Sequence, residues 1–129
     1  MKIWVDDVRP APKGYIWCKS VIDVISLIGV VEKLSYNYQW AIDTADFPEL
    51  HSGLSPIVDN IKKEIEKQKI EVIDIDHDAG DYGPPDYIKV LDWLETTGRN
   101  FPIHIHSMNP VGVENMRRII KKNGWREIR

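Results

Sequence analysis

The chain has 129 residues with a formal net charge of −3, and 43% of its residues are hydrophobic. These values suit one globular domain with its own hydrophobic core. No segment approaches the roughly 20 apolar residues that cross a membrane, and the N-terminus reaches its acidic residues too early for a signal peptide. One cysteine and four histidines exclude a disulfide framework and make a structural zinc site unexpected. We therefore expect a cytoplasmic protein.

The first elements are two short strands and a helix. Residues 2–5 and 15–18 read as strands, and the loop between them is marked by prolines and a glycine. Ser20, with Asp23 in a capping-box position, begins a helix that we expect to end near residue 28.

The segment 30–69 is predicted to contain a strand and a helix. Large apolar and polar residues alternate from 34 to 42, which is typical of a half-buried strand. Ser55 and Pro56 then form a helix start, with a cap and a proline in the first turn.

The second half alternates between strands and helices. Asn109 and Pro110 are a good helix start, and Gly98 and Gly124 are helix ends. The expected elements are strands at 70–76, 102–106 and 125–128 and helices at 86–95 and 111–122.

This alternation predicts an α/β fold in three layers, a mainly parallel sheet with helices on both faces. We expect one domain over residues 1–129. In such sheets ligands bind outside the carboxyl ends of the strands, near the point where the strand order reverses.

Acidic residues follow two of these strands. Asp6 and Asp7 come after the first strand, and Asp76 ends the strand at 70–76. Converging carboxylates repel each other unless a cation neutralises them. They therefore predict a divalent metal site for Mg²⁺, with Mn²⁺ as an alternative. The competing interpretation is that these residues cap turns and helices.

Histidines accompany the acidic residues. His77 lies between Asp76 and Asp78, and His106 ends the strand at 102–106. Imidazole near neutral pH suits general acid–base catalysis, and a carboxylate neighbour orients it. His77, Asp78 and His106 are therefore candidate catalytic residues; the alternative is half-buried histidines with structural hydrogen bonds.

Phosphate binding is predicted at the start of the helix at 111–122. Ser107 and Asn109 precede this helix, whose free N–H groups favour an anion. Arg9 offers bidentate contacts to a phosphate. The alternative for Asn109 is simple helix capping.

Three strings together resemble a known family. They are Asp6-Asp7 with Arg9 and Pro12, the acidic string at 74–80, and Ile-His-Ser-Met-Asn-Pro-Val-Gly at 105–112. They resemble cyclic-phosphate processing receiver-like domains, relatives of response-regulator receivers. The resemblance covers residues 1–29 and 70–129 and implies a flavodoxin-like sheet, with 30–69 as an insertion.

In receivers, an acidic pair holds Mg²⁺, an aspartate accepts phosphate and a serine or threonine follows the fourth strand; Asp6, Asp7, Asp76 and Ser107 match these positions. The chain departs from that pattern in three ways: residues 6–14 leave no room for a helix, the last strand has no lysine, and His77 and Asp78 follow Asp76. These departures disfavour phosphorelay signalling.

The expected function is therefore a metal-assisted phosphoesterase that acts on a cyclic phosphate of a nucleotide or an RNA end. The alternatives are a degenerate receiver that signals or binds a protein partner, and a non-catalytic binder of cyclic nucleotides. The expected partner is a phosphate-bearing small molecule or RNA end, with no membrane. The oligomeric state stays open.

Overall fold

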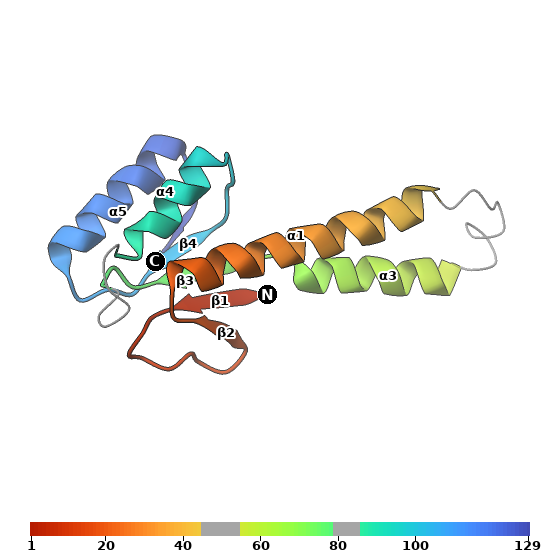
Figure 1. The fold of residues 1–129 in the computed structure, drawn as a ribbon, viewed down its shortest axis with the longest axis horizontal. Helices are drawn as coiled ribbons and strands as arrows, with labels where there is room; N and C mark the ends of the chain where they lie inside the picture. The colour runs from red at the N-terminus through yellow and green to blue at the C-terminus, as the bar shows by residue number, and fades with distance from the viewer. Residues whose placement is uncertain (45–54, 79–85) are drawn as a thin grey trace. The chain divides into compact units, whose positions relative to one another are not determined.

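The computed structural model describes residues 1–44, 55–78 and 86–129 (Figure 1). The chain divides into two compact units. Met1–Ser26 and Ile70–Arg129 form the first unit, and Leu27–Lys69 form the second. The second unit covers nearly the same residues as the predicted insertion at 30–69. None of the described helices is long and apolar enough to cross a membrane.

Five short strands form one parallel sheet in the order β2-β1-β3-β4-β5. They are β1 (Lys2–Val5), β2 (Tyr15–Cys18), β3 (Val72–Ile75), β4 (Ile103–Ile105) and β5 (Glu127–Ile128). This order is that of flavodoxin-like α/β folds, with the reversal between β1 and β3. The predicted receiver/flavodoxin-like α/β fold with a parallel sheet is confirmed, and so is each predicted strand of this unit, the last three over a shorter range.

The helix after β4 begins and ends at the predicted signals, whereas the helix after β3 begins at Ile88, two residues after its predicted start, and ends just before the predicted glycine. α5 (Pro110–Asn123) is capped by Asn109, and Gly124 follows it in the left-handed conformation with φ of 66°. α4 (Ile88–Thr96) ends just before Gly98, which also has a positive φ. A Cβ disfavours this backbone conformation, so glycine suits both helix ends.

One face of the sheet is apolar. Successive strand residues point to opposite faces. From β3 to β4 and from β4 to β5 the chain moves across the sheet in the same direction. Because such crossovers are right-handed, α4 and α5 lie on the same face of the sheet. The fully buried residues of these strands and helices form the core: Ile3, Val5, Ile73, Ile75, Ile103, Val90, Leu91, Leu94 and Met116.

The other face of the sheet is polar. Trp4, Asp74 and His104 lie in register on β1, β3 and β4. From β1 to β2 the chain moves across the sheet in the opposite direction. A helix between these two strands would therefore cover this polar face. Residues 6–14 are a loop, however, as the two prolines predict. A groove opens on this face. Its described lining residues lie in or beside strands: Lys2, Tyr15, Glu71, Val72, Asp74, His104, Ile128 and Arg129.

The predicted strand at 34–42 is wrong. These residues belong to α1 (Val21–Thr44), a single helix that also runs past the predicted end near residue 28. The Ser20–Asp23 capping box forms as predicted. Once a helix is nucleated each added residue gains a hydrogen bond, and no proline interrupts this one. The alternating pattern instead leaves Tyr36 and Trp40 exposed on the helix, at 69% and 59%.

α3 (Ser55–Gln68) is a further described helix of the second unit, and it begins at the predicted Ser55. The described part of residues 30–69 therefore contains helix where a strand and a helix were expected.

Candidate functional site

The three predicted metal ligands meet at the switch point of the sheet. Asp6 and Asp7 follow β1, and Asp76 follows the neighbouring strand β3. One carboxylate oxygen from each lies within 4.8 Å of the others. Asp6 and Asp76 are buried and Asp7 is half-buried. The parallel register of β1 and β3 accounts for this convergence.

Asp6 is fully buried and heavily hydrogen-bonded. Its Oδ1 accepts hydrogen bonds from the backbone N–H groups of Val8 and Arg9 at 2.8 and 2.9 Å. Its Oδ2 lies 3.0 Å from His106 Nε2. Burial raises the pKa of Asp6, but the hydrogen bonds and the charge of His106 outweigh burial and bring the pKa below its usual value. Asp6 is therefore ionised at neutral pH.

Arg9 joins two of the three aspartates. Its Nε lies 3.1 Å from Asp6 Oδ2, and its Nη2 lies 3.5 Å from Asp76 Oδ2. The guanidinium thus supplies positive charge that the converging carboxylates need. Its side chain is 43% exposed. The predicted contact of Arg9 with a phosphate stays a prediction.

A second chain of contacts runs from Asp76 to the start of α5. Asp76 Oδ1 accepts a hydrogen bond from the backbone N–H of His77 at 2.7 Å. His77 Nδ1 lies 2.9 Å from Asp78 Oδ1, which also accepts a hydrogen bond from Asn109 Nδ2 at 3.2 Å. The contacts with His77 and Asn109 lower the pKa of Asp78. An ionised Asp78 therefore orients the His77 ring.

The residues at the start of α5 serve the helix. Asn109 Oδ1 accepts a hydrogen bond from the backbone N–H of Gly112 at 3.0 Å, so the capping alternative is confirmed for Asn109. Ser107 Oγ accepts one from the backbone N–H of Asn109 at 3.2 Å. Phosphate binding by Ser107 and Asn109 stays a prediction, and it rests on the anion preference of helix N-termini.

His77 packs directly on the backbone of Gly112. A Cβ at this position would lie 2.3 Å from His77 Cγ, so Gly112→Ala is expected to displace the ring and lower the thermal unfolding midpoint, although alanine is the better helix former. Gly29→Ala is the matched control because a Cβ there meets no atom within 4 Å. It is expected to stabilise α1 by up to about 1 kcal/mol. Thermal unfolding followed by circular dichroism compares the two variants; equal stabilisation would contradict this packing.

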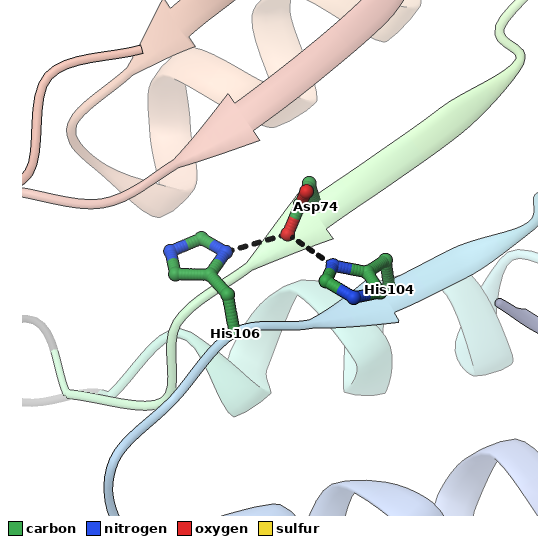
Figure 2. A group of neighbouring side chains, drawn as sticks. All are labelled: Asp74, His104 and His106. Carbon is green, nitrogen blue, oxygen red and sulfur yellow. Dashed lines mark hydrogen bonds and ion pairs between the residues drawn. The ribbon is translucent and has the colours of Figure 1, made fainter. Parts of the chain in front are cut away.

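The sequence interpretation missed one cluster, which Figure 2 shows. Asp74, inside β3, is buried, and its Oδ1 lies 2.8 Å from His104 Nδ1 and 2.6 Å from His106 Nδ1. Burial raises the pKa of Asp74, but the contacts with His106 and His104 outweigh it and lower the pKa overall. The cluster therefore contains a buried carboxylate between two imidazoles.

A signal for this cluster was present in the sequence. Asp74 stands two residues before Asp76, and His104 stands two before His106, so each pair shares one face of its strand. The pairing of Asp74 with His104 follows from the register of β3 and β4. That register became known only from the structure.

His106 links Asp74 to Asp6, one of the three aspartates at the strand ends. Its Nε2 faces Asp6 Oδ2, and its Nδ1 faces Asp74 Oδ1. A neutral imidazole carries one N–H, so both contacts are hydrogen bonds only when His106 is an imidazolium. The Trp4 ring stacks on it, with centroids 3.8 Å apart and planes 4° apart. An aromatic face favours such a cation.

The fold and the acidic strand ends define a receiver-like α/β domain. The family model of the cyclic-phosphate processing receiver domain matches residues 40–122, and the chain belongs to this family. The match includes Asp74, His77 and His106, whereas Asp6 and Arg9 precede it. No match was found among curated proteins or among solved structures. The family associates this domain with cyclic-phosphate processing and thereby with a phosphate-bearing substrate.

Proposed function

We propose that this domain is a metal-assisted phosphoesterase that opens a cyclic phosphate on a nucleotide or an RNA end. The observation that carries the proposal is the convergence of Asp6, Asp7 and Asp76 at the switch point of the sheet. Membership of the cyclic-phosphate processing family supplies the substrate class.

The three aspartates suit Mg²⁺, with Mn²⁺ as the alternative, because both ions prefer oxygen ligands. A bound ion would stabilise negative charge on a phosphoryl oxygen and make a water molecule more acidic. Arg9 holds Asp6 and Asp76 together in this structure. A bound metal would neutralise these carboxylates and would leave the partly exposed guanidinium of Arg9 available to the phosphate.

The proton transfers fall to His77 in this proposal. Ring opening requires a base that takes a proton from the attacking water and an acid that protonates the leaving oxygen. Asp78 engages His77 Nδ1, which leaves Nε2 as the nitrogen that exchanges protons. Both nitrogens of His106 already face carboxylates, so we assign His106 to holding Asp6 in position. Ser107 and Asn109 would bind the phosphate together with Arg9.

The test is turnover of a substrate panel by the folded chain. Purified protein is mixed with Mg²⁺ or Mn²⁺ and with 2′,3′-cyclic nucleotides, 3′,5′-cyclic nucleotides and an RNA that ends in a 2′,3′-cyclic phosphate, and ring opening is followed by mass spectrometry. We expect turnover that chelation of the metal abolishes. Absence of turnover across this panel would reject the proposal.

Asp76→Asn tests whether turnover depends on the three aspartates while the fold is retained. It removes one ligand charge, and turnover is expected to fall by at least about 100-fold, the scale on which single electrostatic contacts act in catalysis. Asp92→Asn is the matched control, because Asp92 is a surface residue of α4 paired with Lys89. Circular dichroism of both variants confirms folding; an active Asp76→Asn would place the chemistry elsewhere.

The two alternatives give different results. A degenerate receiver would be phosphorylated on Asp76, and the absence of a lysine from β5 (Glu127–Ile128) disfavours this because receivers use one to bind the acyl phosphate. Intact-protein mass after treatment with acetyl phosphate tests it. A non-catalytic binder would be stabilised by an intact cyclic nucleotide in thermal-shift measurements without forming product.

A further inference from the structure

The geometry points to a second metal site, formed by Asp74, His104 and His106, that takes Zn²⁺ or a similar divalent transition metal. This site is distinct from the three aspartates at the strand ends, and its chemistry differs. Two imidazoles and one carboxylate are a ligand set of zinc and other transition metals, whereas oxygen-only sets suit Mg²⁺.

The three donor groups already converge. One ligand atom from each residue lies within 4.8 Å of the others. Asp74 Oδ1 contacts both Nδ1 atoms (Figure 2). A metal ion would replace the protons in these contacts, and the three side chains would move slightly apart to admit it, because each donor lies about 2.0–2.2 Å from a bound zinc. The paired register of Asp74 and His104 fixes this arrangement in the sheet.

The surroundings of His106 match those of a metal ligand. A ligating histidine usually donates its other ring N–H to a carboxylate, which fixes the tautomer and the ring orientation. Asp6 Oδ2 lies 3.0 Å from His106 Nε2 and provides that acceptor. The stacked Trp4 ring fixes the plane of the imidazole. His106 Nδ1 is thereby aimed at Asp74 and away from Asp6.

The site is buried on one side and open on the other. The side chains of Asp74 and His106 are 8% and 9% exposed, whereas His104 is 34% exposed. His104 and Asp74 line the groove on the polar face of the sheet, so an ion can enter there. Three protein donors leave a coordination position for water or another ligand. Lys2 and Arg129 line the same groove, and their charges favour an anion at that position.

Cobalt binding tests this site without relying on enzyme activity. Untagged full-length chain is first saturated with Mg²⁺, which occupies oxygen-only sites, and is then titrated with Co²⁺ under visible absorption spectroscopy. Nitrogen ligands and a low coordination number give much stronger bands than an all-oxygen octahedral ion. We expect one Co²⁺ per chain with such bands, and we expect Zn²⁺ to displace it.

Three variants locate the ion. His104→Ala replaces the most exposed ligand and is expected to weaken Co²⁺ binding by more than about tenfold, the lower bound for residues that merely support a ligand. Asp74→Asn is expected to do the same, and His104→Ala keeps the test valid if that variant fails to fold. His77→Asn is the control, because His77 belongs to another cluster, with Asp78 and Asp86, and binding should be unchanged.

The proposal is overturned by either of two outcomes. One is the absence of strong bands in the wild-type chain. The other is a band that His104→Ala leaves intact or that His77→Asn removes. Neither outcome bears on turnover at the three aspartates, which Asp76→Asn tests separately.

Discussion

His106→Ala is expected to lower the free energy of unfolding at pH 7 by about 2–6 kcal/mol, because two buried carboxylates each lose a hydrogen-bond partner at a cost of about 1–3 kcal/mol. Two buried carboxylates, those of Asp6 and Asp74, lose the imidazole between them, and Trp4 loses its stacking partner. Urea denaturation measures the loss. His104→Ala is the milder comparison, because His104 is more exposed and, among the aspartates that the structure describes, contacts Asp74 alone.

The stability of His106→Ala should depend on acidic pH differently from that of the wild type. His106 contributes to the lowered pKa values of both Asp6 and Asp74. Without it, burial still opposes ionisation, so both pKa values rise. The stability that depends on these low pKa values is lost in acid, so the variant should lose less stability than the wild type as the pH falls below about 4. Urea midpoints across acidic pH values measure this; parallel pH profiles would contradict the bridging role of His106.

Asp6→Asn is the second substitution with a large expected effect. The asparagine Oδ1 can still accept the hydrogen bonds from the backbone of Val8 and Arg9, but its NH₂ group would face the donors of Arg9 and His106. Each buried group left unsatisfied costs about 1–3 kcal/mol, and the proposed ligation of a metal by Asp6 would be lost. We expect lower stability at pH 7 and no turnover.

The pH dependence of this effect has a defined sign. The pKa of Asp6 is lower in the folded chain than in the unfolded chain, where an aspartate has about 3.9. The stabilisation is therefore complete above about pH 4 and is lost as the pH falls through the folded value. The difference in stability between wild type and Asp6→Asn should shrink over that acidic range. A difference that stays constant down to the lowest pH would contradict the assignment; Asp92→Asn serves as the surface control.

Local signals in the sequence located most of the elements. The Ser20–Asp23 capping box, Asn109 with Pro110, and Gly124 each act through backbone groups within a few residues, so neighbouring residues suffice to predict them. The prediction of a strand at 34–42 was wrong because alternation with a period of two cannot by itself distinguish a strand from the continuation of a helix that began upstream.

The sequence by itself determined which chemical groups follow the strands and that a parallel sheet would gather Asp6, Asp7 and Asp76 at one edge. This was predictable because the carboxyl ends of parallel strands share an edge. Only the tertiary structure decided that β3 and β4 pair in the register that places Asp74 beside His104, and that His106 joins Asp74 to Asp6. Strand register depends on packing across the whole sheet, so no local pattern encodes it.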